Sequence, residues 1–119
     1  MSKVSNMSSM FKGTSFNQPL NKWDTSSLEN MDSIFLCAKS FNQDINSWNV
    51  SKVKDMSLAF MFASKFNQNL DKWNVKNCEN FNCMFALSGF KQDLRSWNID
   101  LEQEDVFGEI LRNEVKGLI

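Results

Sequence analysis

The chain has no histidine and no tyrosine among its 119 residues, and it has only one proline and four glycines. The absence of histidine removes the commonest general base near neutral pH and the commonest metal ligand. No glycine-rich loop that could cradle a phosphate and no recurring pair of acidic residues is present. We therefore expect a protein that is not an enzyme and that uses neither a metal nor a cofactor.

Excess charge and long hydrophobic runs are also missing. Thirteen Lys and Arg face fourteen Asp and Glu, a net charge of −1 that gives nucleic acid no attraction. No run approaches the roughly 18 apolar residues of a transmembrane segment, and residues 1–13 lack the apolar stretch of a signal peptide. As a full-length protein the chain would be cytoplasmic, whereas a piece of a longer exported parent would lie at the cell surface or be secreted.

Cysteine is scarce and odd in number, which argues against a framework of disulfides. Cys37, Cys78 and Cys83 each occupy a position where another repeat carries a hydrophobic residue. Without a CxxC pair or a histidine there is no zinc pattern. We expect buried thiols that act as small hydrophobic side chains.

What the sequence does contain is a repeat of about 25 residues. A phenylalanine precedes a tryptophan by seven residues four times, and length variation is confined to one later interval. We call these two sets the Phe column and the Trp column. The Phe column is Phe16, Phe41, Phe66 and Phe90, and the Trp column is Trp23, Trp48, Trp73 and Trp97.

Two hydrophobic periods follow each other within a repeat. Trp48 and Val50 alternate with polar residues, which predicts a strand with one buried face. The next apolar residues are spaced three, four and three apart, which predicts a short helix. These residues are Val53, Met56, Phe60 and Ala63. The residues at the N-cap position of such helices would be Asn6, Asn30, Asp55 and Asn80. Successive strands would lie parallel and adjacent, with equivalent residues stacked in columns.

The repeat pattern stops after residue 100. Residues 101–119 predict an amphipathic helix, because acidic residues gather near its start, basic residues near its end and apolar residues on one face. We expect a repeat domain over residues 1–100, whose first repeat is partial, and a helix over residues 101–119 that caps its open end.

The words NMSSMF, FNQDI and WNVSKV, which recur with variations over residues 4–99, resemble the BspA-like leucine-rich repeat. They also resemble the related bacterial surface protein repeat, a domain of unknown function. The resemblance implies an α/β fold, a right-handed leucine-rich-repeat-like solenoid with one short parallel strand and one short helix per repeat. It also implies a role at bacterial surfaces, often in adhesion, and it carries over no catalytic residues.

Two recurring features could be exposed or structural. An exposed Trp column could stack on sugar rings, but its alternation with polar residues favours a buried core for both the Phe and the Trp column. The Asn-Gln pair after each Phe could be a ligand-binding row of amides, but pairing with backbone groups in a turn is favoured. Met61 and Phe62 would form a binding patch if exposed and would belong to the core if covered.

Polar residues beside the Trp column are the candidate ligand-binding face. They would line the concave surface of a leucine-rich horseshoe, where partners commonly dock; the alternative is a solvated face. The eight residues, called the polar row below, are Lys22, Asp24, Ser47, Asn49, Lys72, Asn74, Ser96 and Asn98.

We therefore expect a non-catalytic module that binds a protein or a glycan, as a fragment of an adhesion-type surface protein. The alternative is a structural spacer or self-assembly segment with no ligand, whose partners are further repeats of the same array.

Overall fold

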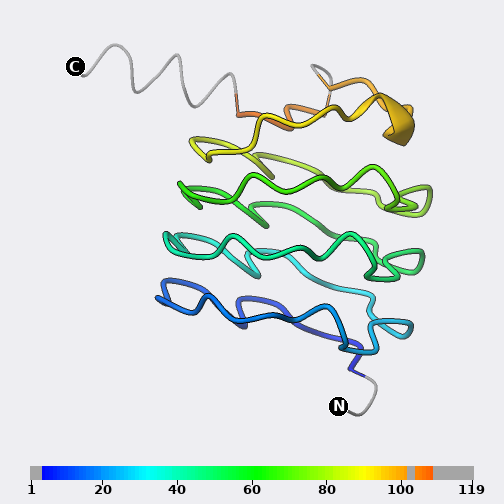
Figure 1. Cartoon of the computed structure of the whole chain (residues 1–119). Helices are drawn as coiled ribbons and strands as arrows, with labels where there is room; N and C mark the ends of the chain where they lie inside the picture. Colours follow the sequence, from blue (N-terminus) through cyan, green and yellow to red (C-terminus); the bar gives the residue numbers. More distant parts are fainter. Residues whose placement is uncertain (1–3, 102–103, 109–119) are drawn as a thin grey trace.

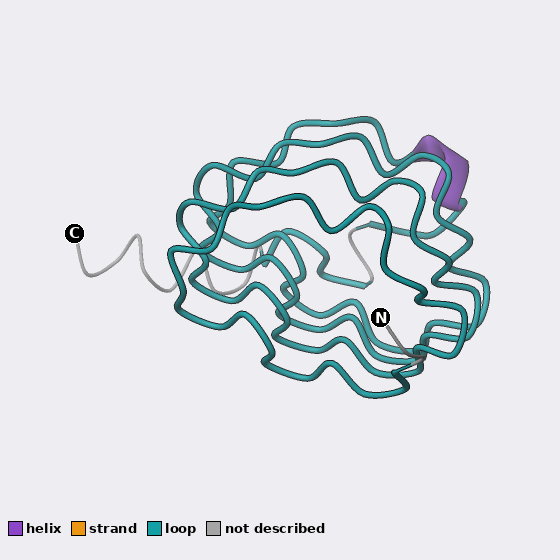
Figure 2. Cartoon of the chain, turned by 60° about the horizontal axis from the view of Figure 1, so that its bottom comes forward, coloured by secondary structure: helices purple, strands orange, loops and turns teal. Residues whose placement is uncertain are grey.

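The computed structural model describes residues 4–101 and 104–108, and in these residues the chain winds through stacked rungs (Figure 1). The stack begins at the N-terminal end, and residues 104–108 lie on the last rung. Viewed obliquely along the stack, the rungs enclose a common interior (Figure 2). We number the rungs 1 to 4, over residues 4–27, 28–52, 53–77 and 78–101.

Regular secondary structure is almost absent from the described part of the chain. Its only helix is the short 3-10 helix η1, Arg95–Trp97. No strand is formed there, and the parallel pairing between rungs is limited to single bridges. These bridges join Asn6 to Asn30, Asn30 to Asp55 and Asp55 to Asn80. The expectation of an α/β leucine-rich-repeat-like solenoid with a strand and a helix in every repeat is therefore wrong.

Left-handed residues break the expected helix of rung 3. The turns 56–59 and 60–63 each close with a bond from the last N–H to the first carbonyl oxygen, at 3.2 and 3.0 Å. Leu58 and Phe62, third in their turns, have φ of 58° and 60°, which a right-handed helix does not allow. The same two positions are left-handed in the other rungs: Ser9 and Gly13, Ser33 and Cys37, Cys83 and Leu87.

Alternate N–H groups of these turns bond to the next rung instead of within the chain segment. A helix would direct them to the carbonyl four residues earlier, whereas here they hold two rungs together. In rung 3 the donors are Met56, Leu58, Phe60 and Phe62, and the acceptors in rung 4 are Asn80, Asn82, Met84 and Ala86, at 2.8–3.0 Å. The spacing of three and four residues thus arises from tight turns that point the same side chains inward.

The strand expected at Trp48 and Val50 is also replaced by turns. The Trp48 N–H donates to the Ile45 carbonyl and the Val53 N–H to the Val50 carbonyl, both at 3.0 Å. Between them, Asn49 Oδ1 accepts the N–H of the residue two positions later, at 3.0 Å. Asn and Asp side chains that bond to the nearby backbone favour turns over extended chain.

The Phe and Trp columns lie along the interior. Phe41, Phe66 and Phe90 are buried, as are Trp48, Trp73 and Trp97. Phe16 and Trp23, in rung 1, are half-buried. A third aromatic set packs beside the Phe column: the rings of Phe35, Phe60 and Phe85 stack at centroid distances of 5.4 and 5.5 Å.

The predicted capping helix, residues 101–119, lies mostly outside the described residues, which here are Leu101 and residues 104–108. The latter form a turn on rung 4. The Cys83 N–H donates to the Asp105 carbonyl at 3.0 Å, and the Phe85 N–H to the Val106 carbonyl at 2.9 Å. Gly108 has φ of 62°, and a Cβ on it would lie 2.7 Å from Ala86 Cβ, so only glycine fits this approach.

Candidate functional site

All eight residues of the polar row are exposed. Three of them fix their own turns, because Asp24, Asn49 and Asn74 each accept an N–H from the residue two positions later. The bonds come from Ser26, Ser51 and Lys76, at 3.0, 3.0 and 3.1 Å. The oxygen of each side chain therefore has a structural role, while the amide nitrogens of Asn49 and Asn74 face outward with no partner among the described residues.

The row's two serines join neighbouring rungs. Ser47 Oγ donates to the Asn21 carbonyl at 3.3 Å, and Ser96 Oγ donates to the Asp71 carbonyl at 2.9 Å. These bonds hold the polar row in register between rungs.

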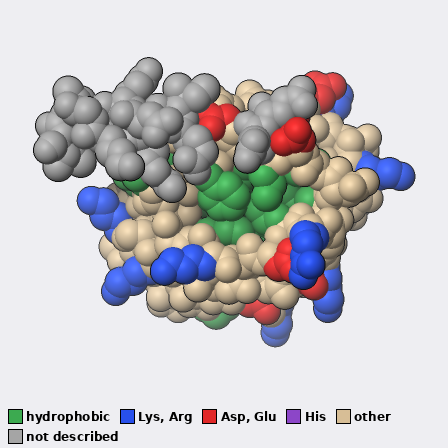
Figure 3. Space-filling model, turned by 90° about the horizontal axis from the view of Figure 1, so that it is seen from above, with side chains coloured by type: hydrophobic (Ala, Val, Ile, Leu, Met, Phe, Trp, Pro, Cys, Tyr) green, Lys and Arg blue, Asp and Glu red, His purple; other side chains and the backbone are tan. Residues whose placement is uncertain are grey.

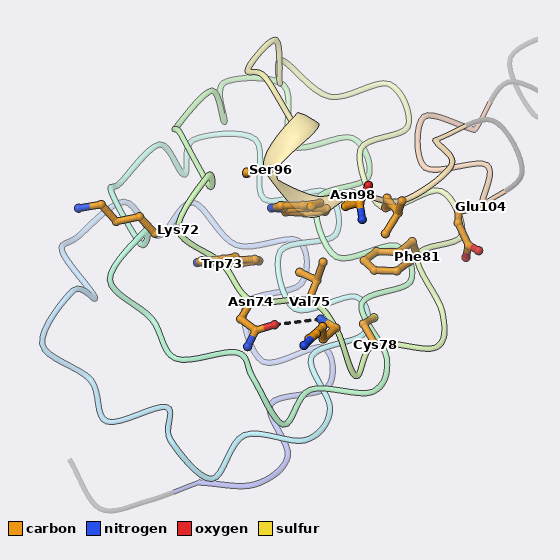
Figure 4. Close-up of a pocket in the computed structure, with 12 residues that line it drawn as sticks. Lys72, Trp73, Asn74, Val75, Cys78, Phe81, Ser96, Asn98 and Glu104 are labelled. Carbon is orange, nitrogen blue, oxygen red and sulfur yellow. Dashed lines mark hydrogen bonds between the residues drawn. The ribbon is translucent and has the colours of Figure 1, made fainter.

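The structure brings half of the polar row around one pocket of about 560 Å³ between rungs 3 and 4 (Figure 4). Lys72 and Asn74 contribute from rung 3, and Ser96 and Asn98 from rung 4. Asn98 is left-handed, with φ of 54°, at the end of η1. The other four residues of the row lie in rungs 1 and 2 and do not border this pocket.

The Trp column supplies the inner wall of the pocket. The indole rings of Trp73 and Trp97 are parallel within 3°, with centroids 6.3 Å apart. Phe81 lies 5.9 Å from the Trp97 ring. All three side chains are buried, so the wall exposes only narrow aromatic edges and gives no free indole face for a sugar ring.

The pocket carries few charges. Lys72 and Glu104 lie at opposite sides of it (Figure 4). Burial raises the pKa of the Cys78 thiol to about 11, so this thiol is neutral near pH 7 and is a poor nucleophile. The arrangement offers hydrogen bonds and weak charge recognition. In the part of the chain that the structure describes, no group of His, Cys, Asp or Glu could hold a metal ion.

A smaller pocket of about 350 Å³ adjoins Ser96. It is lined by Asn69, Asp71, Gln92, Asp93 and Ser96. The Arg95 guanidinium donates to the Asp93 carboxylate, with Nη2 2.6 Å from Oδ2, and these bonds lower the pKa of Asp93. The two pockets together make a polar surface on the last two rungs.

The Asn-Gln pairs form a hydrogen-bonded ladder between rungs. Asn42 Oδ1 accepts the Asn67 N–H and the Gln68 Nε2–H, both at 3.0 Å. Asn17 in rung 1 and Asn67 in rung 3 do the same for the rung after them, at 2.9–3.1 Å. The ladder is structural. It ends at Lys91, whose side chain has no acceptor atom.

The sequence left open whether Met61 and Phe62 of rung 3 are exposed or belong to the core. Met61 is half-buried and Phe62 is 39 % exposed, so only Phe62 projects clearly from the flank.

The pocket between rungs 3 and 4 also includes residues outside the polar row, among them Lys76, Ile99 and Glu104. The sequence could not identify Glu104 as a pocket residue, because it lies after the end of the repeat.

The C-terminal end surface is distinct from the flanks. Seen from that end, hydrophobic side chains gather in the middle and polar side chains surround them (Figure 3).

None of the helices in the described residues has the length and apolar character to cross a membrane.

Comparison with known proteins places residues 1–97 in one family. The matching family is described as "Mycoplasma protein of unknown function, DUF285". No curated protein and no solved structure matches the chain.

Proposed function

We propose, from the premise that this chain belongs to the DUF285 family, that it is a non-catalytic interaction module that binds a protein segment or a glycan. The observation that carries the proposal is the pocket between rungs 3 and 4, which gathers four residues of the polar row. The surface-associated role implied by the likeness to BspA-like repeats is part of the same proposal.

The chemistry of the pocket favours a neutral ligand rich in oxygen acceptors. The Asn74 and Asn98 amide nitrogens and the Lys72 ammonium have no partner among the described residues, so their N–H groups are available to a ligand. Peptide carbonyls and sugar oxygens accept such bonds. The aromatic wall behind them excludes water from one side of the ligand, which strengthens hydrogen bonds at the rim.

Two substitutions test the pocket without disturbing the core. Lys72→Met removes the ammonium, and Asn98→Gly removes the amide while a left-handed backbone is kept. Lys22→Met is the matched control, because Lys22 occupies the same column in rung 1, away from the pocket. The probes are a panel of oligosaccharides and of host-matrix proteins, immobilised and washed at fixed salt concentration.

We expect a ligand retained by the unmodified chain and by Lys22→Met, and bound about tenfold more weakly by Lys72→Met and by Asn98→Gly, a loss of about 1.4 kcal/mol. Equal retention of that ligand by all four proteins would exclude the pocket. If no probe is retained by the unmodified chain, the spacer or self-assembly alternative is favoured instead.

A further inference from the structure

Rung 1 exposes side chains that every other rung buries. Met10 is 40 % exposed, whereas Ile34, Ala59 and Met84, at the same position in rungs 2, 3 and 4, are 0 % exposed. The later residues are covered because each has the preceding rung beneath it. Met10 is the clearest sign that the lower face of rung 1, below called the N-terminal face, has no such cover among the described residues.

Aromatic side chains make the centre of this face apolar. Phe11, Phe16 and Trp23 are half-buried, while the corresponding aromatic residues of the later rungs are buried. The Phe11 ring lies 4.9 Å from the Phe16 ring and 5.8 Å from the Trp23 ring, between centroids. The three rings therefore form one cluster, and Met10 is a further exposed apolar side chain of the same rung.

One long side of the N-terminal face carries unused hydrogen-bond acceptors. In each of rungs 2, 3 and 4, four carbonyl oxygens accept N–H groups from the preceding rung. In rung 1 the equivalent oxygens accept no bond from any described residue. They belong to Asn6, Ser8, Met10 and Lys12.

The other long side carries unused donors. In rung 2, the Asn42 N–H, the Gln43 Nε2–H and the Trp48 Nε1–H all donate to rung 1, at 2.9 Å. Their rung 1 equivalents have no acceptor among the described residues. These are the Asn17 N–H, the Gln18 Nε2–H and the Trp23 Nε1–H. Acceptors and donors thus run along opposite sides of the aromatic cluster.

The opposite end of the stack is closed to the same kind of pairing. The carbonyls of Asp105 and Val106 already take two of the N–H groups that a further rung would use. Lys91 replaces the ladder asparagine and offers no side-chain acceptor. Stacking of one copy's N-terminal face on another copy's last rung would therefore lose these bonds.

We propose that two copies of this chain associate through their N-terminal faces about a two-fold axis. An axis parallel to the long sides of rung 1 places the acceptor side of one copy over the donor side of the other. It also joins the two aromatic clusters at the centre. A two-fold interface must be self-complementary, and a face with acceptors on one side and donors on the other meets that requirement. This inference is independent of the pocket proposed above, which lies in rungs 3 and 4.

Sedimentation velocity across a dilution series of the full chain tests the proposal. The decisive variants are Met10→Glu and its matched control Phe62→Glu, because the two side chains are 40 % and 39 % exposed but only Met10 lies on the N-terminal face. We expect a reversible monomer–dimer equilibrium for the unmodified chain. Met10→Glu places a charge on the apolar interface of each copy, which must lose its water when the dimer forms, and raises the dimer dissociation constant about tenfold or more, whereas Phe62→Glu leaves it unchanged.

Tryptophan emission gives a second readout. Dimer formation covers Trp23, so emission shifts to shorter wavelength with concentration, and the shift disappears in Trp23→Phe. A chain that stays monomeric throughout, a weakening by Phe62→Glu equal to that by Met10→Glu, or growth into larger polymers would each overturn the two-fold dimer. Circular dichroism of both glutamate variants checks that they are folded, and Lys72→Met leaves the dimer intact whether or not the pocket binds a ligand.

Discussion

The indole Nε1–H of Trp73 donates a hydrogen bond of 2.9 Å to the backbone carbonyl oxygen of Ile45, in the preceding rung. Trp48 and Trp97 make the same bond to Leu20 and Leu70, at 2.9 and 3.0 Å. The Trp column thus has two roles in the fold. Its rings fill the interior, and its N–H groups tie each rung to the one before it.

Trp73→Phe separates these roles, because it keeps an aromatic ring and removes the N–H. We expect a loss of about 1–3 kcal/mol in the free energy of unfolding, from the lost hydrogen bond and the smaller ring. Urea denaturation followed by circular dichroism measures it. Trp23→Phe, measured at concentrations where the chain is monomeric, is the control, since Trp23 is half-buried and its Nε1–H meets no acceptor in the described residues. A larger loss for Trp23→Phe than for Trp73→Phe would contradict this account.

The amide ladder predicts that the same exchange has different effects at its middle and at its end. Asn67→Lys removes the oxygen that accepts the Lys91 N–H and the Gln92 Nε2–H. We expect it to lower the free energy of unfolding by about 1–2 kcal/mol. Lys91→Asn, the reverse exchange one rung later, changes stability little, because no described residue occupies the next step of the ladder. Thermal denaturation of both variants measures the difference, and equal effects would show that the ladder does not stabilise the stack.

Substitutions at two glycines, Gly89 and Gly13, distinguish the effect of steric crowding from the effect of a left-handed backbone. A Cβ on Gly89 would overlap the Ser64 carbonyl oxygen and lie 3.3 Å from the Phe66 carbonyl oxygen. Gly13 has φ of 67° and nothing within 4 Å of an added Cβ. We expect Gly89→Ala to destabilise by about 1–3 kcal/mol or more, and Gly13→Ala by about 1 kcal/mol, from its left-handed backbone alone. Chemical denaturation compares them, and a milder effect at Gly89 would contradict the close contact between rungs 3 and 4.

Cys78 predicts a specific pH dependence. Burial raises the pKa of its thiol from about 9.0 to about 11 in the folded chain. The unfolded chain therefore loses this proton first, and the thiol's contribution to stability, complete below pH 9, is lost as the pH rises toward 11. Cys78→Val, which places the residue of Val53 in the same column, removes this contribution. We expect the melting temperature of the unmodified chain to fall more steeply than that of Cys78→Val over this range; parallel curves would contradict it.

The sequence alone could predict which residues stack in columns, but it could not predict the local backbone. Spacing places Trp48 and Trp73 at one position of successive rungs, because register follows from counting residues. The sign of φ at Leu58 and Phe62 has no such signal. Bulky side chains rarely adopt φ above zero, and the sequence does not mark the positions where they do. A spacing of three and four residues therefore predicts a helix from the sequence alone.

The candidate site was predictable to a similar extent. Alternation with the Trp column identified the exposed polar positions, including Lys72 and Asn98. It could not show that a pocket forms between the last two rungs. The pocket lies where the chain leaves the repeat after Ile99 and brings Glu104 beside Cys78 of rung 4, and nothing in the repeat pattern encodes this change of path.

The alternation of bonds within a turn and bonds to the next rung has a consequence for how such a chain can change length. Because alternate N–H groups of these turns find their acceptors one full circuit away, inserting or removing a few residues inside 53–63 would shift the donors that follow in rung 3 relative to their acceptors in rung 4. A copy of residues 28–52 placed after residue 52 would instead recreate each partnership. A chain built in this way should therefore accept changes of length by whole circuits, and shorter insertions at the loop between residues 63 and 66, where rung 4 is one residue shorter at Gly89.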